Sequence, residues 1–180
     1  MAIKFNPTEL SEVILIEPEV WPDDRGHFAE LYHREKYRAA GIEAVFLQDN
    51  FSFSCRGALR GLHYQLNKPQ AKLVTALAGE IWDVAVDLRR SSPTFKRWVA
   101  ARLSGENKRQ LYIPAGFGHG FCVLSETASV LYKCSELYSP ADDRSLRWSD
   151  PELAIAWPVQ EPMLSKKDLA APLLAEAELF

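Results

Sequence analysis

Hydrophobic and polar residues alternate along much of the chain from Val45 onward. In the segment 51–54 (FSFS) two phenylalanines alternate with two serines, and in 81–88 the large apolar residues at even positions alternate with Asp83, Ala85 and Asp87. Further short apolar runs, separated by clusters of Gly, Pro, Ser and Asn, cover residues 13–18, 27–32, 109–113, 120–124 and 129–134. This pattern is typical of an antiparallel β sandwich or barrel.

Helical patterns are brief. Residues 33–40 (HREKYRAA) are rich in helix formers and charges, and Gly41 follows as a C-terminal cap, so we predict one short solvated helix there. The segment from Trp148 onward contains several prolines and reads as loop. Within it, Ser165 and Asp168 have the spacing of a capping box, which gives Asp168 a structural explanation of its own.

Composition sets the size and the class of the protein. The 180 residues are 47% hydrophobic and 25% charged, which predicts a single domain over residues 1–180. The 21 Lys and Arg against 24 Asp and Glu leave a net charge of −3, which argues against a surface devoted to nucleic acid. An anionic ligand must therefore be bound by a local group of basic residues.

The ends and the cysteines bear on location. The first residues, MAIKFNPTELSEV, contain no apolar signal region, and no stretch approaches the roughly 18 apolar residues of a membrane span, so we expect a cytoplasmic protein. Cys55, Cys122 and Cys134 have no C-x-x-C spacing. They predict neither a disulfide framework nor a thiolate zinc site, and we expect all three to be buried as small apolar residues.

The first candidate for chemistry is the segment 55–72, which contains Arg60, His63 and Lys72. A permanent cation, an imidazole that titrates near neutral pH and a flexible ammonium suit proton transfer on an anionic substrate. A structural interpretation stands beside this one. A single histidine in a strand usually has a structural role, Arg60 could form a surface ion pair, and Lys72 could be a charge that protects an exposed strand edge.

Strand geometry raises two questions about these residues. His63 and Arg60 fall on opposite faces of a regular strand, so a shared site requires a bulge, for which Gly61 is suited. The only turn residues after 72–77 are Ala78, Gly79 and Glu80. If Ala78 and Gly79 form the loop of a two-residue hairpin, Lys72 lies diagonal to Asp83 and Asp87. The resulting contact could be an ordinary cross-strand ion pair or part of a site.

A motif points to the fold. Residues 114–119 (PAGFGH) read P-x-G-x-x-H and resemble the second half of the cupin signature, and Gly79 fits the first half. The resemblance predicts an all-β double-stranded β-helix, or jelly roll, with short flanking helices and a central cavity. Tyr64 and Gln65 stand where a metal-binding cupin would supply a second imidazole. We therefore expect no metal.

A broader resemblance covers most of the chain from about Val13 to Asp168. It is carried, in order, by QDN (48–50), LRGLHYQ (59–65), GEIWDVAVDLR (79–89), SPTF (92–95), ENKRQL (106–111), PAGFGHGF (114–121) and LYK (131–133). Together these motifs resemble the dTDP-4-dehydrorhamnose 3,5-epimerase family. The resemblance implies a cofactor-free jelly-roll homodimer that converts dTDP-4-dehydro-6-deoxy-D-glucose to dTDP-4-dehydro-L-rhamnose, with part of the nucleotide site completed by the neighbouring subunit.

The same resemblance assigns roles to single residues. His63 resembles the general base, Asp168 the carboxylate that orients it, Tyr132 the acid on the opposite face, and Lys72 the group that stabilises the enolate oxygen. The expected substrate-binding residues are Arg60 and His119 at the sugar and diphosphate, Gln48 and Asn50 at the nucleotide sugar, and Arg25, Glu30, Asp143 and Lys167 at the nucleotide. Asp83 is expected to support this set from behind.

Two departures from the family pattern keep alternatives open. His27 stands where an aromatic apolar residue is expected, and Leu137 precedes Tyr138 where paired tyrosines are expected. The alternatives are an epimerase that inverts C3 alone and a non-catalytic cupin that binds a sugar nucleotide. A metal-dependent cupin oxygenase is a third hypothesis. The small number of metal ligands argues against it.

Overall fold

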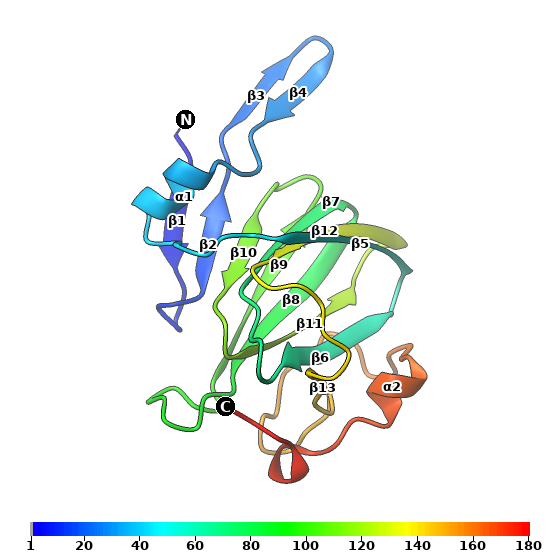
Figure 1. Cartoon of the computed structure of the whole chain (residues 1–180). Helices are drawn as coiled ribbons and strands as arrows, with labels where there is room; N and C mark the ends of the chain where they lie inside the picture. Colours follow the sequence, from blue (N-terminus) through cyan, green and yellow to red (C-terminus); the bar gives the residue numbers. More distant parts are fainter. Residues whose placement is uncertain (1) are drawn as a thin grey trace.

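The computed structural model describes residues 2–180 and consists mainly of two antiparallel β-sheets (Figure 1). In spatial order, the first sheet contains β1 (Lys4–Pro7), β2 (Ile14–Glu17), β10 (Gln110–Ile113), β7 (Lys72–Ala78), β12 (Thr127–Cys134) and β5 (Gln48–Cys55). The second contains β13 (Asp143–Ser145), β6 (Leu59–Gln65), β11 (Phe117–Val123), β8 (Glu80–Asp87) and β9 (Trp98–Ser104). The predicted all-β jelly roll is confirmed.

The main core lies between the two sheets. Val74 and Val130 of the six-stranded sheet pack in one cluster with Ile81, Ala85 and Phe121 of the five-stranded sheet. These are the inward-facing positions of alternating strands, so burial of their apolar surface holds the sheets face to face. The alternation that the sequence shows at 81–88 therefore has an inner face and an outer face.

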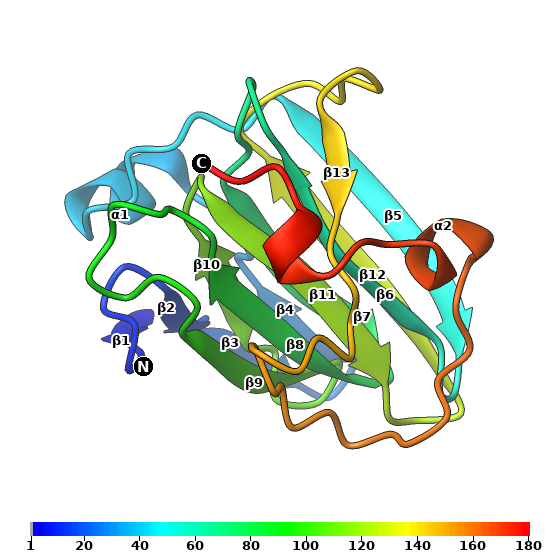
Figure 2. The same cartoon turned by 90° about the horizontal axis from the view of Figure 1, so that it is seen from below.

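The C-terminal segment covers the outer face of the five-stranded sheet (Figure 2). Val84 and Val86 of β8 pack there against Leu146, Leu153 and Leu174 of the segment. The segment includes α2 (Lys166–Leu169) and a 3-10 turn, η1 (Leu174–Glu176). Both faces of β8 are thus buried. The C-terminal segment, residues 146–180, is held near the edge of the five-stranded sheet that is formed by β13 and β6.

The predicted bulge at Gly61 is present. Between Arg60 and His63, β6 has one residue more than its partner β11 has between Phe121 and His119. Gly61 has a φ of +115°, and a Cβ at this position would approach the backbone oxygen of His119 to 2.6 Å. Only glycine fits there, and the extra residue shifts the strand's side chains relative to the sheet.

The predicted hairpin between residues 72–77 and 81–88 is wrong. β7 pairs with β10 and β12, whereas β8 pairs with β11 and β9, so the two strands belong to different sheets. Gly79, with a φ of +73°, makes the crossing from one sheet to the other. Lys72 and Asp83 both face the interior, but they do so from opposite sheets and not from one hairpin. The two strands lie in different sheets because each contributes apolar residues to the core between them.

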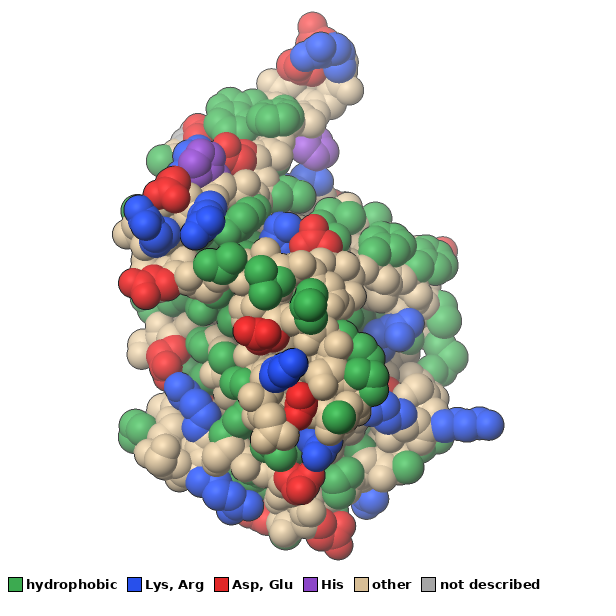
Figure 3. All heavy atoms as spheres, in the orientation of Figure 1, with side chains coloured by type: hydrophobic (Ala, Val, Ile, Leu, Met, Phe, Trp, Pro, Cys, Tyr) green, Lys and Arg blue, Asp and Glu red, His purple; other side chains and the backbone are tan. Residues whose placement is uncertain are grey.

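A two-stranded hairpin projects away from the two sheets (Figure 1). It is formed by β3 (Val20–Asp23) and β4 (Gly26–Ala29), with Arg25 in its turn. Trp21 and Phe28 lie opposite each other across it, with ring centroids 5.6 Å apart, and both are exposed. Figure 3 shows charged side chains at its tip and hydrophobic atoms nearer its base.

The remaining local predictions had mixed outcomes. The helix α1 (Arg34–Ala39) is confirmed and is largely solvated, although Tyr37 is buried. Cys122 and Cys134 are buried as expected, but Cys55 is exposed, because it ends an edge strand on the outward side. None of the helices within residues 2–180 combines the length and hydrophobicity needed to cross a lipid bilayer.

Candidate active site

A cavity of about 260 Å³ opens at one end of the barrel, between the two sheets and the C-terminal segment. Residues from β5, β6, β7, β12, β13 and α2 contribute to it, so its walls come from both sheets. The lining residues are Gln48, Asn50, His63, Tyr64, Gln65, Gln70, Lys72, Tyr132, Tyr138, Asp143 and Lys167. Seven of these were expected from the sequence.

His63 and Asp168 form an imidazole–carboxylate pair at the cavity. The His63 Nε2 atom lies 2.6 Å from Asp168 Oδ1, and the His63 side chain is 33% exposed while that of Asp168 is 3% exposed. Burial disfavours the charged carboxylate, but hydrogen bonds from His63 and Ser165 outweigh it, so the pKa of Asp168 lies below its usual range. An ionised Asp168 requires the proton on His63 Nε2, which leaves Nδ1 as the basic nitrogen.

The position of Asp168 follows from its helix cap. Ser165, the N-cap of α2, accepts a hydrogen bond from the Asp168 backbone amide and donates its hydroxyl hydrogen to Asp168 Oδ2. The capping prediction is therefore confirmed. The same carboxylate reaches the imidazole, since one oxygen is bound by Ser165 and the other by His63.

Lys72 and Tyr132 enter the cavity from the six-stranded sheet. Both are inward-facing, and burial lowers the pKa of the Lys72 ammonium while it raises the pKa of the Tyr132 hydroxyl. Lys72 is held by one long hydrogen bond, from Nζ to the His63 carbonyl oxygen at 3.4 Å. A cation and a protonated phenol thus stand opposite the imidazole of His63.

A second imidazole–carboxylate pair lies deeper in the barrel. His119 of β11 and Asp83 of β8 are joined by a 2.9 Å contact between Nε2 and Oδ1, and they are 5% and 0% exposed. Burial is the main cause that lowers the pKa of His119, and the Asp83 carboxylate opposes it. His119 does not line the cavity but stands behind its wall, next to the Tyr132 ring.

Polar side chains surround the outer part of the cavity. The Gln48 side chain donates to Asn50 Oδ1 and accepts from the Tyr138 backbone amide, which ties β5 to the loop after β12. Asp143 accepts hydrogen bonds from the Tyr138 hydroxyl and from the Lys167 ammonium. These groups join β13 to α2 at the rim.

Besides His119, which was expected at the sugar and diphosphate, three more expected substrate-binding residues lie outside the lining of the cavity. Arg60 lies outside its lining, with its guanidinium bound to Ser54 Oγ, although its charge acts on Tyr132. Arg25 is on the projecting hairpin, where its side chain is 90% exposed and pairs with Asp23. Glu30 pairs with Lys36 of α1. Within one chain, Arg25 and Glu30 are therefore not part of the site.

Four lining residues were not among the expected site residues. Gln70 and Gln65 share strand parity with Lys72 and His63, respectively, so alternation alone could have indicated them. Tyr64 and Tyr138 had no such signal. Tyr64 is next to His63 in sequence, and its hydroxyl donates to the Glu178 carbonyl of the tail, which the sequence could not place.

No group of three or more histidine, cysteine, aspartate or glutamate side chains within residues 2–180 is arranged to hold a metal ion. The expected absence of a metal stays a prediction. The groups that converge on the cavity are instead an oriented base, a buried ammonium and a buried phenol. This set is suited to proton transfer next to a carbonyl group, because the ammonium can stabilise the resulting enolate.

Comparison with known proteins gives a consistent assignment. The sequence profile of the dTDP-4-dehydrorhamnose 3,5-epimerase family matches residues 7–176. The chain is 54% identical over 180 residues to dTDP-4-dehydrorhamnose 3,5-epimerase of Pseudomonas aeruginosa, covering 99% of each chain.

Solved structures agree with this match. One is the dTDP-6-deoxy-D-glucose-3,5-epimerase of Legionella pneumophila in complex with dTDP-4-keto-L-rhamnose, with a TM-score of 0.95, 50% identity and coverage of 98% of this chain and 95% of that one. Another is a 3'-monoepimerase from Streptomyces bikiniensis in complex with dTDP-quinovose, with a TM-score of 0.89, 39% identity and coverage of 94% and 87%. The chain belongs to the dTDP-4-dehydrorhamnose 3,5-epimerase family.

Proposed function

We propose that the protein inverts C3 and C5 of dTDP-4-dehydro-6-deoxy-D-glucose and so produces dTDP-4-dehydro-L-rhamnose. Both carbons flank the C4 ketone, so each carries an acidified proton whose removal gives an enolate. Membership of the family and the composition of the cavity both support this reaction. No redox change is involved, because each inversion removes one proton and returns one.

His63 acts as the base through Nδ1, with Asp168 fixing the ring and stabilising the imidazolium that forms. Lys72 supplies a positive charge to the enolate oxygen at C4, and Tyr132 donates the replacing proton. Gln48, Asn50, Asp143 and Lys167 bind the nucleotide sugar at the rim of the cavity, and Tyr138 lies beside them. Arg60 acts near Tyr132 at the diphosphate side.

One observation carries this proposal. His63 belongs to the five-stranded sheet and Tyr132 to the six-stranded sheet, and both line the same cavity. A sugar held between them meets a base on one face and an acid on the other. Removal of a proton from one face and its return on the opposite face is what inversion requires.

Deuterium exchange tests the reaction. The pure protein is incubated with the 4-keto sugar nucleotide in deuterated water, and the sugar is analysed by NMR. We expect deuterium at both C3 and C5, together with inversion at each carbon. Deuterium at C3 alone would establish a 3-epimerase, which His27 and Leu137 keep as a second candidate, and exchange at neither carbon would reject catalysis in favour of simple binding.

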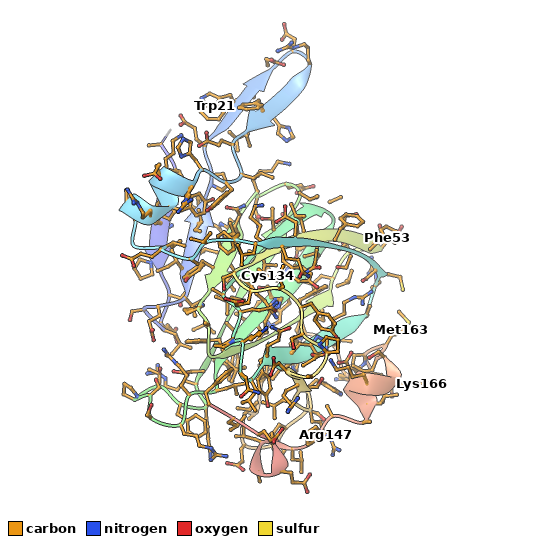
Figure 4. The ribbon with its side chains drawn as sticks, viewed as in Figure 1. Trp21, Phe53, Cys134, Arg147, Met163 and Lys166 are labelled. Atoms are coloured by element: carbon orange, nitrogen blue, oxygen red, sulfur yellow. The ribbon has the colours of Figure 1, made fainter. Side chains whose placement is uncertain are left out.

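The active form is proposed to be a homodimer. Phe51 and Phe53 on the edge strand β5 are 63% and 62% exposed, and Trp21 and Phe28 are exposed on the projecting hairpin. Figure 4 shows Phe53 and Trp21 on these two elements. Exposed aromatic residues on a sheet edge and on an extended arm are typical of an interface. A second copy would cover them and would let Arg25 reach its neighbour's nucleotide.

Subunit mixing tests this assembly. In a dimer that shares its sites, Arg25→Ala and His63→Ala are each inactive alone, but a mixed dimer contains one site with both residues intact. Random mixing should restore about a quarter of the sites. No recovery after mixing, or a monomer in light scattering of the native protein, would contradict the proposal. The matched control is a mixture of His63→Ala with Tyr132→Phe. Both residues line the cavity of one chain, so every site in a mixed dimer lacks one of them and no activity should return.

A further inference from the structure

Gln65 lines the active-site cavity, yet the hydrogens of its amide are all bound within the protein. The residue is 3% exposed. Its Nε2 atom donates to the backbone oxygens of Lys68, at 2.9 Å, and Leu137, at 3.2 Å, while Oε1 accepts the backbone amide hydrogen of Ser139 at 2.7 Å. An amide nitrogen carries only two hydrogens, so none is left to donate to a sugar. Gln65 therefore acts on the protein and not on the substrate.

Two of these contacts are with the mouth loop, residues 135–142, which joins β12 to β13. Tyr138 of this loop lines the cavity. From the other side, Gln48 of β5 accepts the backbone amide hydrogen of Tyr138 at 2.8 Å. Two side-chain amides thus bind the backbone of three consecutive residues, 137–139. One amide belongs to each sheet, so the loop is held from both walls of the cavity.

The middle of the mouth loop has little apolar anchoring of its own. Leu137 and Tyr138 are 59% and 54% exposed, and neither belongs to a hydrophobic cluster of residues 2–180. Gln70 and the Leu66 amide bind the loop near its two ends, at the backbone oxygens of residues 136 and 142. An exposed segment keeps one position only when its backbone groups are bound. The position of residues 137–139 therefore depends on the two amides that bind them.

We propose that Gln65 is a positioning residue, which holds the mouth loop so that Tyr138 stands at the cavity before a ligand arrives. A binding wall that is already ordered loses less conformational freedom on binding, which increases affinity. His63 and Tyr132 lie on strands that are paired independently of the mouth loop. Gln65 should therefore affect binding of the nucleotide sugar more than proton transfer.

The inference rests on the proposed dTDP-sugar substrate, so binding and turnover are measured separately. Gln65→Met keeps the length of the side chain and removes all three hydrogen bonds. The Kd of dTDP by calorimetry and the KM of the 4-keto sugar nucleotide should rise about tenfold, the scale of ordering one or two additional side chains on binding. We expect kcat to stay within about threefold of the native value. An unchanged Kd, or a loss in kcat alone, would overturn the inference.

Gln65→Glu gives a readout that lost packing would not produce. An ionised glutamate has no hydrogen to donate to the Lys68 and Leu137 oxygens, whereas the protonated acid donates one and still accepts from Ser139. Protonation of the introduced acid therefore restores part of the native hydrogen bonding.

The charges around position 65 act on the introduced acid in both directions. Asp143 lies opposite Gln65 in the pairing of β13 with β6, and its carboxylate and burial raise the pKa of the acid. Lys72 and Lys167 line the same cavity and oppose this rise.

The pH dependence of binding follows from this protonation. The dTDP affinity of Gln65→Glu, divided by that of the native protein at the same pH, should be lowest near about pH 8 and rise toward about pH 5 as the acid takes up its proton. The same ratio for Gln65→Met should stay constant. A ratio for Gln65→Glu that is flat, or that falls toward acid pH, would contradict the role of these hydrogen bonds.

Asp150→Asn is the matched control. Asp150 is also buried and accepts three backbone amide hydrogens, from Glu152, Leu153 and Leu174, none of which lines the cavity. This variant should have a lower melting temperature but an unchanged Kd for dTDP. A rise in Kd equal to that of Gln65→Met would mean that general destabilisation weakens binding, and the inference would be rejected.

A measurement on the native protein keeps the inference testable if a variant fails to fold. The amide hydrogens of Tyr138 and Ser139 are bound by Gln48 and Gln65, so without ligand they should exchange with deuterated water at least about tenfold more slowly than in an unfolded peptide. Unprotected exchange would show that only the ligand orders the loop, and would overturn the inference. If the native protein binds no dTDP, the proposed function fails and takes this inference with it. Normal native binding with an unchanged Kd in Gln65→Met rejects the inference alone.

Discussion

Two imidazole–carboxylate pairs on neighbouring strands differ in exposure and in the origin of the carboxylate. His63 is partly open to the cavity and is paired with Asp168 from the tail helix α2, whereas His119 is closed off and paired with Asp83 from its own sheet. The residue types and the contact are the same in both. The elements that cover each pair decide its access to the cavity. His63 can therefore reach a bound sugar directly, whereas His119 is separated from the cavity by its neighbours.

The largest effect is expected from His63→Asn, which removes the accessible imidazole. Exchange at both carbons should fall by about 10⁴-fold, because no other described imidazole lines the cavity. Deuterium incorporation followed by NMR measures the loss, and binding of dTDP by calorimetry should be retained. Substantial remaining exchange would show that the deeper imidazole can replace the accessible one.

Tyr132→Phe comes next, with a loss of about 10³-fold in inversion. The phenol is the donor on the wall facing His63, and the phenyl ring preserves its packing. Proton removal itself should suffer less than inversion, so the ratio of exchange to inversion should rise. An unchanged ratio would mean that another group donates the replacing proton. It would then contradict the assignment of the base to one wall of the cavity and of the acid Tyr132 to the facing wall.

Asp168→Asn should cost about 10²-fold, because the amide removes the charge that favours the imidazolium and can hold the wrong tautomer. The Ser165 cap can still form, so the melting temperature should change little. Steady-state kinetics should show the loss in kcat. A loss confined to KM would mean that this carboxylate contributes to binding and not to orientation of the base.

The smallest effect on activity is expected from Asp87→Asn. Asp87 is a second buried carboxylate of β8, but unlike Asp83 it contacts no histidine of the site. Arg89, Ser92 and Thr94 all donate to Asp87, and these bonds, acting against burial, hold its pKa well below the usual range. The change should lower the free energy of unfolding by about 2 kcal/mol at pH 7.

The pH dependence of this difference has a definite sign. A depressed pKa in the folded state gives stability that is fully present above the unfolded value, near 3.9, and is lost as the pH falls below it. Urea unfolding at pH 7, 4 and 3 should therefore show the native protein and the Asp87→Asn variant converging as the pH falls. A difference that grows toward acid pH would contradict this account.

Much of the fold and the site could be predicted because local rules and tertiary structure agree there. Alternation separated the two faces of β8, although its larger apolar residues face the C-terminal segment and not the core between the sheets. The need to bring Arg60 and His63 together indicated the bulge at Gly61. The capping pattern at Ser165 was also correct. The family motifs then placed seven residues that do line one cavity.

The predictions that failed concern features that depend on contacts between residues far apart in the sequence. A short Gly-containing turn is compatible with a hairpin and with a crossing between sheets, and Gly79 makes the crossing because both strands must contribute to one core. Tyr64 is oriented by the distant tail, through Glu178. Arg25 lies in the turn of the projecting hairpin, where its side chain is 90% exposed and pairs with Asp23. None of these could be read from neighbouring residues.

The link between α2 and β6 also has a consequence for biosynthesis. The carboxylate that orients His63 lies 105 residues further along the chain, beyond every strand of both sheets. The alignment of His63 therefore waits for a part of the chain that is synthesised after every strand. A chain that ends before α2 would lack the carboxylate that orients the imidazole.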